Sequence, residues 1–221
     1  MSEYEHDKIV PYAASNAAKK EQVATMFDHI AKRYDFLNRF LSLGIDQGWR
    51  KKAIGFFGQQ KINHLLDIAT GTADMALMAN KTIAPKKITG IDISETMHLE
   101  AKRLNETFKD QAEFVLYEGT KLPFEDKTFD KIFTVNTVYF WENPVEYLNE
   151  IYRVLKKNGT FVLTFGQRDF METLPFTQFD FTLYNSDEME ETVSKSFFKR
   201  MKISEKEEKI KSKTGNELIK R

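Results

Sequence analysis

The sequence predicts an α/β fold with a doubly wound, mostly parallel sheet of the Rossmann-like kind. Short apolar segments alternate with helical segments between residues 65 and 165, which is typical of a parallel sheet wrapped by helices. The first apolar segment ends in an acid, a turn and a helix, as ligand-binding loops of such sheets do. With 221 residues, of which 41% are hydrophobic, the chain is long enough for a sizeable core.

Each predicted strand is an apolar run closed by a turn or by a helix-start signal. The strands are expected at residues 65–69, 88–93, 112–117, 131–135 and 160–165. Helices are expected over 74–81, after a Ser94 cap, and from Asn143-Pro144 onward, where the side chain of Asn143 suits the free N–H groups of a helix start. The buried face of that last helix is predicted to be Leu148, Ile151, Tyr152 and Leu155.

A helical period precedes the first strand. Apolar residues from Val23 to Leu41 fall on one stripe, and Asp46 is placed to cap a further helix that carries Trp49, Ala53, Ile54 and Phe57. We therefore expect residues 1–60 to form an N-terminal helical lid, and residues 61–221 to form one ligand-binding domain.

The tail has a different character. Residues 199–213 are highly charged, and their apolar and polar side chains alternate as in an edge strand. Thr214-Gly215-Asn216 is typical of a hairpin turn. Only residues 217–221 follow, so we expect a shortened last strand and a weakened sheet edge.

Composition excludes several classes of function. Lysine plus arginine number 33, as do aspartate plus glutamate, so no basic excess favours nucleic acid. The chain has no cysteine, and its four histidines are isolated in the sequence, so we expect no disulfide and no metal site. No apolar run approaches the ~20 residues of a membrane span, and the N-terminus lacks a signal-peptide pattern. We expect a cytoplasmic protein with at most peripheral membrane contact.

Acids mark the ends of successive strands. Asp67 lies in the first strand, and the loop Thr70–Ala73 follows it. Asp92 ends the second strand, 21 residues after Gly71, and Glu118 follows the third strand. Ligands of open α/β sheets bind at these carboxyl ends, and an acid at the end of the second strand suits ribose hydroxyls. The loop and its acids are therefore predicted to hold a nucleoside.

The identity of that nucleoside follows from the missing groups. A phosphate-binding P-loop needs Gly-Lys-Ser/Thr, which is absent, and a dinucleotide site favours a second glycine where Ala73 stands. An acid-rich loop suits a nucleoside that carries positive charge, such as S-adenosylmethionine. The alternative is an ordinary strand–turn–helix whose carboxylates are solvated or act as caps.

The motifs DIATGTAD, GIDIS, LPFEDKTFD and RVLKKNG resemble class I S-adenosylmethionine-dependent methyltransferases over about residues 60–167. Upstream, the sequence resembles the ubiquinone/menaquinone biosynthesis C-methyltransferases. That narrower resemblance rests on Tyr34, Asp35, Asn38, Leu41, Ser42 and Trp49. The C-terminal half, with NTVYFW and TFGQ, resembles generic small-molecule methyltransferases instead.

The resemblance implies S-adenosylmethionine as cofactor, S-adenosylhomocysteine as product, and a small-molecule acceptor such as a lipid-tailed, demethylmenaquinone-like quinol. The family's cofactor contacts fall on Thr72, Asp92, Glu118 and Gly119. The full predicted cofactor-binding set adds Tyr34, Asp67, Ala69, Thr70, Gly71, Ile93, Met97 and Asn136.

The acceptor side is less determined by the sequence. Tyr139, Phe140 and Trp141 follow the fourth strand and are candidates for an apolar acceptor pocket, with core packing as the alternative. His29 is expected on a helix surface rather than as a base, so no catalytic residue is assigned. Two other functions stay open: methylation of another small molecule, and a cofactor-binding module without catalysis. The oligomeric state is not predicted.

Overall fold

The computed structural model describes residues 46–58, 60–104, 106–108, 110–173, 181–205, 208–211 and 217–220. The expected lid helix over residues 17–41 lies outside these residues, so the lid boundary stays a prediction. The described chain divides into two compact units. The sheet unit comprises described residues 46–135 and 150–164, and the second unit comprises described residues 136–149 and 165–220.

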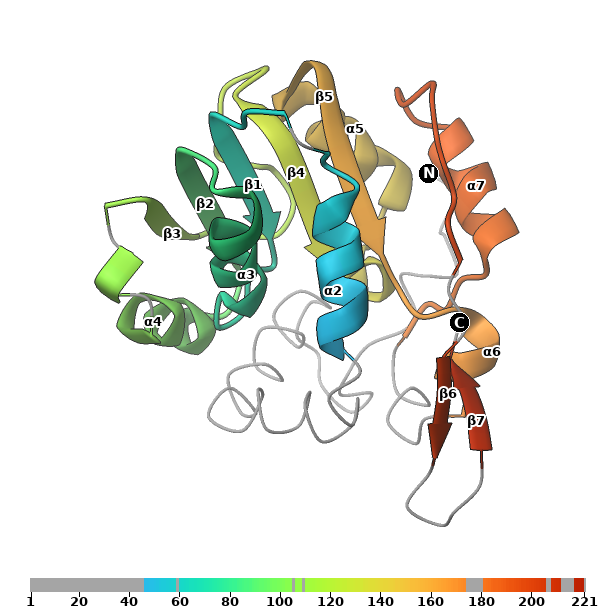
Figure 1. Ribbon diagram of the computed structural model, residues 1–221. Coiled ribbons are helices and arrows are strands. Elements are labelled where there is room, and N and C mark those ends of the chain that lie inside the picture. The colour runs from blue at the N-terminus through green and yellow to red at the C-terminus, as the bar shows by residue number, and fades with distance from the viewer. Residues whose placement is uncertain are drawn as a thin grey trace, which may run out of the picture. The chain divides into compact units, whose positions relative to one another are not determined.

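The sheet unit contains a five-stranded parallel sheet, as the sequence predicts. Its strand order is β3-β2-β1-β4-β5, so the order reverses between β1 and β4 (Figure 1). Parallel strands place all their carboxyl ends at one edge, and a reversal there opens the crevice in which ligands of such sheets bind. The strands are β1 (His64–Ile68), β2 (Lys87–Asp92), β3 (Ala112–Leu116), β4 (Phe129–Val135) and β5 (Leu155–Thr164).

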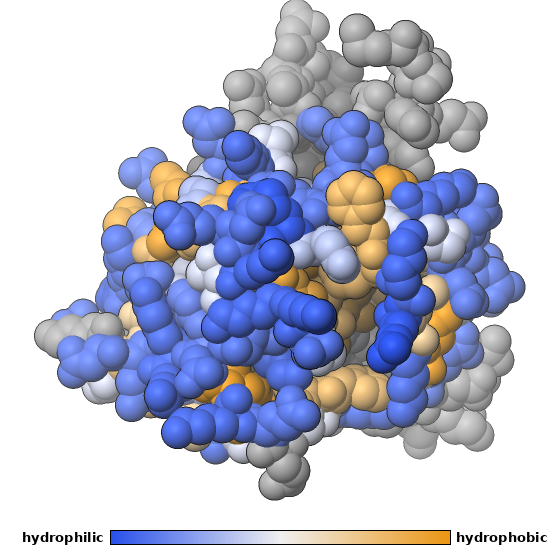
Figure 2. Space-filling view, turned by 90° about the horizontal axis from the view of Figure 1, so that it is seen from above, coloured by the Kyte–Doolittle hydropathy of each residue, from blue (hydrophilic) through white to orange (hydrophobic). Residues whose placement is uncertain are grey.

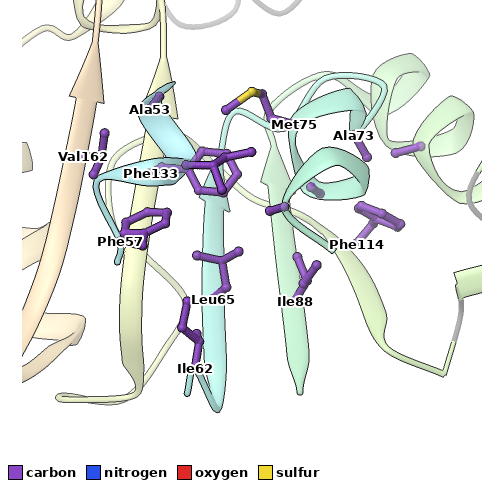
Figure 3. Close-up of a cluster of buried hydrophobic side chains, with 14 residues drawn as sticks. Ala53, Phe57, Ile62, Leu65, Ala73, Met75, Ile88, Phe114, Phe133 and Val162 are labelled. Carbon is purple, nitrogen blue, oxygen red and sulfur yellow. The ribbon is translucent and has the colours of Figure 1, made fainter. Parts of the chain in front are cut away.

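One face of the sheet is covered by α2 (Asp46–Gly55), α3 (Asp74–Ile83) and α4 (Glu95–Leu104), and a short turn of helix, η2 (Glu106–Phe108), follows α4. Figure 3 shows the core cluster, in which Phe57 lies beside Phe133 of β4 with ring centroids 6.1 Å apart, and Leu65 and Ile88 come from β1 and β2. Ala53, Ile54 and Phe57 are buried, and Ala53 and Ile54 lie on α2 as the sequence predicts, whereas Phe57 lies in the turn that follows the helix. This burial fixes α2 against the sheet beside the loop that follows β1.

Two predicted details of the helix α5 (Pro144–Val154) have different outcomes. Asn143 caps it as expected, since its Oδ1 accepts from the Glu146 backbone N–H over 3.2 Å. Tyr152 was expected on the buried face, but it is 46% exposed. That expectation was wrong because the buried stripe runs through Leu148, Ile151 and Val154, and Tyr152 lies about 100° further around the helix than Ile151.

β5 begins irregularly. Its register with β4 shifts between Phe129 and Lys131, and Asn158 has a φ of 66° there, so the strand carries a bulge before Gly159. A Cβ at Gly159 would lie 2.9 Å from the Asp130 carbonyl, which explains the glycine. Among the described residues, no strand pairs with the outer side of β5, in line with the expected weakened edge.

Arg153 connects the two motifs LPFEDKTFD and RVLKKNG. Its guanidinium donates to the carbonyls of Leu122 and Phe124 over 3.0 and 2.7 Å. It also forms ion pairs with Glu150 and Asp126 at 2.7 and 2.9 Å. The two motifs therefore form one structural clamp between α5 and the loop before β4.

The amino ends of the strands carry ion pairs. Lys87 pairs with Glu113 at 2.9 Å and Lys156 with Asp130 at 3.1 Å. Figure 2 looks from above Figure 1, toward these ends, and shows mainly hydrophilic side chains. His64 also lies here, within 2.8 Å of the Thr89 hydroxyl, at the edge of the sheet opposite the carboxyl ends.

The second unit contains η3 (Val138–Phe140), the first part of α5, α6 (Arg168–Met171) and α7 (Ser186–Ser194). A capping box between Asn185 and Glu188 begins α7, and both carboxylate oxygens of Glu188 accept from Arg168. The strands β6 (Glu208–Lys211) and β7 (Glu217–Lys220) pair antiparallel as a separate hairpin (Figure 1). The sequence predicted this hairpin, but residues 201–205 are not part of its first strand.

Candidate functional site

The loop after β1 turns through three left-handed residues. Ala69, Gly71 and Ala73 have φ values of 56°, 56° and 69°. The Thr70 backbone N–H donates to the Ile91 carbonyl over 2.9 Å, and the Thr70 carbonyl accepts from the Ala73 N–H at the same distance. The loop is therefore tied to β2 before α3 begins.

Ala73 stands where a second glycine would relieve a left-handed backbone. An alanine in this conformation costs about 1–2 kcal/mol because its Cβ crowds the carbonyl. Ala73 is fully buried and belongs to the core cluster (Figure 3), and burying a methyl group contributes about 0.8 kcal/mol. Burial of the Ala73 methyl group thus offsets part of its backbone strain, and the loop keeps the left-handed turn that a glycine would favour.

Asp67 lies beneath this loop and is 2% exposed. Burial raises the pKa of its carboxyl to about 8, and the nearby Asp92 carboxylate acts in the same direction, while the Thr70 hydrogen bond and Arg50 oppose the rise. The Thr70 hydroxyl donates to Asp67 Oδ2 over 2.7 Å. Asp67 therefore holds the loop from below, a role that its spacing in the sequence does not reveal.

Asp92 joins the loop after β1 to the loop after β2. Its Oδ2 accepts from the Gly71 N–H over 2.8 Å, and its Oδ1 accepts from the Ser94 N–H over 2.9 Å. Ser94 in turn caps α4 as predicted, because its Oγ accepts from the Met97 N–H over 3.1 Å. A carboxylate can accept about four hydrogen bonds, so this group can order both loops and also receive two hydroxyls of a ribose.

Arg50 is a charged neighbour that the sequence analysis missed. It comes from α2, and its Nη1 lies 3.7 Å from Oδ2 of Asp74, the first residue of α3. Its side chain is only 12% exposed. No spacing rule links Arg50 to the loop, because the contact depends on how α2 packs beside α3.

The structure places most of the other predicted cofactor residues in or beside these loops. Thr72 and Met97 are buried, Ile93 is half-buried, and Gly119 has a φ of 84°. Glu118 is exposed, two residues beyond the end of β3. Asn136, with a φ of 56°, directly follows β4 and belongs to the second unit. Tyr34 lies outside the described residues.

The three candidate acceptor residues differ in exposure. Tyr139 and Trp141 are 1% and 9% exposed, whereas Phe140 is half-buried. Trp141 packs on Tyr147 with ring centroids 4.8 Å apart. Phe140 is therefore the member of this set that can offer a ring surface to a ligand, and its two neighbours support it from within.

Neither His64 nor Tyr139 is suited to act as a base at the loops. His64 lies at the amino ends of the strands, and burial lowers its pKa. Burial raises the pKa of Tyr139, which makes it a poor base. Within the described ranges, no three side chains of the metal-binding types gather around a common point, and none of the helices is long and apolar enough to cross a membrane. His29 lies outside the described residues.

Comparison with known proteins identifies the family of the chain. Residues 15–202 match the ubiE/COQ5 methyltransferase family. Over 162 residues the chain is 40% identical to the demethylmenaquinone methyltransferase of Bacteroides fragilis, covering 72% of this chain and 66% of that protein. Over 160 residues it is 36% identical to the enzyme of the same name from Porphyromonas gingivalis, covering 71% and 65%. The chain thus spans just under two thirds of the length of these relatives.

Solved structures agree on the fold. The complex of the Haloferax volcanii Trm112 methyltransferase activator with a methyltransferase aligns with a TM-score of 0.65 and 23% identity, over 76% of this chain and 74% of that one. At this identity the likeness supports the doubly wound fold alone, because one fold carries many activities.

Proposed function

This chain belongs to the ubiE/COQ5 methyltransferase family, and we propose that it transfers a methyl group from S-adenosylmethionine to a ring carbon of a demethylmenaquinol-like acceptor. The relatives that carry a demethylmenaquinone methyltransferase name support this acceptor. The observation that carries the proposal is the position of Asp92, whose carboxylate holds the Gly71 and Ser94 N–H groups where the first two strands end.

The loop chemistry fits a sulfonium nucleoside. Asp92 would accept the ribose hydroxyls, and Glu118 with Gly119 would lie at the adenine edge, as in the resemblance drawn from the sequence. The loop Thr70–Ala73 contains no lysine or arginine, which suits a ligand without phosphate. S-adenosylmethionine supplies an activated methyl group on its sulfonium, so the protein has mainly to position the two reactants and exclude water.

The acceptor needs one further event. Forming a carbon–carbon bond to a quinol ring breaks the sulfur–methyl bond, and the ring then loses a proton from the methylated carbon. Prior loss of a phenolic proton makes the ring electron-rich. Neither His64 nor Tyr139 is assigned this deprotonation, since His64 lies at the opposite edge of the sheet and Tyr139 has a raised pKa.

A second acceptor class has its own supporting observation. The sequence of residues 136–141 and 165–167 resembles enzymes that methylate other small molecules, while the match to the ubiE/COQ5 family runs through both segments. This alternative keeps the cofactor site and changes only the ring or chain that receives the methyl group. A cofactor-binding module without catalysis is the third possibility.

The test is methyl transfer from radiolabelled S-adenosylmethionine to a panel of demethylmenaquinols, other quinols and unrelated small acceptors. Label in demethylmenaquinone supports the proposal, and label only in another acceptor supports the alternative. Cofactor binding without label in any acceptor supports the binding module. A cytoplasmic location, peripheral membrane contact and a lipid tail on the acceptor stay predictions.

A further inference from the structure

The segments that follow β4 and β5 contact each other directly. Tyr139 belongs to NTVYFW, four residues after the end of β4, and Gly166 belongs to TFGQ, two residues after the end of β5. The Gly166 backbone N–H donates to the Tyr139 hydroxyl over 2.6 Å. The same hydroxyl donates to the Gly166 carbonyl over 3.2 Å. The two segments are therefore one coupled feature rather than two independent ones.

The coupling is buried and tight. Tyr139 is 1% exposed, and Gly166 is buried as well. A Cβ at Gly166 would lie 2.9 Å from Met171 Sδ, so the backbone approaches α6 closely here. A buried N–H that loses its acceptor is destabilising, which makes the tyrosine hydroxyl hard to replace.

Tyr139 also fixes two rings that are less buried than itself. Its ring centroid lies 6.2 Å from Phe140 and 5.6 Å from Phe181. Phe140 and Phe181 are both half-buried and pack edge to face, with centroids 4.8 Å apart. The Tyr139 carbonyl accepts from the Thr182 N–H over 3.1 Å, which holds the Phe181 segment in place.

We propose that Tyr139 is a positioning residue for the methyl acceptor: its hydroxyl holds the segments after β4 and β5 together, so that Phe140 and Phe181 form an apolar wall for a flat, uncharged aromatic ring. The inference rests on the proposed function, because it takes the ligand of this wall to be the methyl acceptor. Aromatic side chains pair with flat rings in offset or edge-to-face geometry, and such pairs are favourable beyond the area that they bury. The acceptor class implied is a bicyclic quinol or quinone.

The test separates this inference from the proposed reaction by using a probe that needs no turnover. The probe is 2-methyl-1,4-naphthoquinone, titrated by calorimetry into the full chain saturated with S-adenosylhomocysteine. The chain has no cysteine, so this thiol-reactive quinone meets no thiol to alkylate. Tyr139→Phe removes only the hydroxyl, and Phe140→Leu removes one ring of the wall. Tyr184→Phe is the matched control, because it removes another buried tyrosine hydroxyl in the same unit.

We expect Tyr139→Phe and Phe140→Leu each to weaken probe binding by about tenfold or more, because both disturb the same wall. The double variant should lose little beyond either single variant, and Tyr184→Phe should bind the probe as the wild type does. In turnover, KM for the acceptor should rise in Tyr139→Phe.

Three results would overturn the inference. These are a wild type that does not bind the probe at millimolar concentration, a Tyr139→Phe variant with unchanged affinity, and an equal loss in Tyr184→Phe. If Tyr139→Phe fails to fold, probe affinity is compared in Phe140→Leu, Phe181→Leu and the double variant of these two. Losses that add up in the double variant would mean that the two rings act independently, which contradicts a shared wall. If the variants weaken probe binding as expected but no quinol is methylated, the proposed reaction is rejected and the inference about the aromatic wall stands.

Discussion

Gly71 and Asp92 lie 21 positions apart in the sequence, and the Gly71 N–H donates to Asp92 Oδ2 over 2.8 Å. This bond makes one carboxylate responsible for the shape of the first loop and for the end of β2. Because Ser94 N–H binds the other oxygen, the start of α4 depends on the same group. The proposed cofactor site is therefore a single hydrogen-bonded unit rather than a row of separate acids.

Gly90 gives the first prediction. A Cβ at this position in β2 would lie 2.9 Å from Thr70 Oγ1 and 2.8 Å from the Phe114 ring. We expect Gly90→Ala to lower the free energy of unfolding by about 1–3 kcal/mol through overpacking, and to weaken cofactor binding by displacing Thr70 from Asp67. Urea denaturation and calorimetry measure the two effects.

Gly55→Ala is the matched control, since nothing lies within 4 Å of a Cβ there and the residue ends a helix. It should leave cofactor affinity unchanged. If Gly90→Ala is as stable as Gly55→Ala, a Cβ at position 90 does not displace the Thr70 side chain.

Arg153 gives the second prediction. Its guanidinium serves two carbonyls and two carboxylates, and its side chain is 26% exposed. Arg153→Ala leaves the Leu122 and Phe124 carbonyls and Glu150 without this donor, so we expect a loss of about 2–4 kcal/mol in the free energy of unfolding. Thermal or urea unfolding provides the measurement.

Arg103→Ala is the control for charge. Arg103 pairs with Glu100 on the surface of α4 and its side chain is 66% exposed, so solvent screens the pair. Its removal should leave the unfolding midpoint unchanged. Equal effects of the two substitutions would mean that the clamp contributes no more than a surface pair.

Asp67 gives the third prediction, on pH. Its folded pKa of about 8 lies above the ordinary value of 3.8, so the folded state keeps a proton that the unfolded chain releases. The stability from this group is present below pH 4 and is lost as the pH rises toward 8. Relative to Asp67→Asn, the wild type should lose on the order of a few kcal/mol between pH 5 and pH 9.

Asp130→Asn controls for the general effect of losing a carboxylate. Hydrogen bonds from His64 N–H and Lys156, opposed by partial burial, hold the pKa of Asp130 below its usual value, so both test pH values lie above it. Its stability difference from the wild type should be the same at pH 5 and pH 9. A constant difference for Asp67→Asn as well would show that Asp67 is ionised in the folded protein.

The strands were predictable because each is a short apolar run with a clear end signal, and the observed bounds lie within two residues of the expected ones except at the start of β5. That exception has a cause, since the residues before Gly159 form a bulge that pairs with β4 out of register. The position of Asp92 was also predictable, because the spacing from Gly71 is fixed by one helix and one strand.

Other parts of the site depend on tertiary packing and escaped the sequence. Arg50 reaches Asp74 only because α2 lies beside α3, and Tyr139 meets Gly166 across 27 positions. Asp67 was expected among the cofactor contacts, but the structure also gives it a supporting role through Thr70. No local pattern encodes such pairs, because each partner is chosen by the fold and not by its neighbours in the chain.

Binding of S-adenosylmethionine at Asp92 is measured by titrating the folded chain with this cofactor in a calorimeter, beside Asp92→Ala and the exposed control Asp110→Ala. We expect the wild type and Asp110→Ala to bind it. We expect Asp92→Ala to lose about 1–3 kcal/mol, or roughly 5- to 150-fold in Kd, through lost charge-assisted hydrogen bonds. No binding by a folded wild type at millimolar ligand, or equal affinity in Asp92→Ala, would rule out a cofactor site at Asp92.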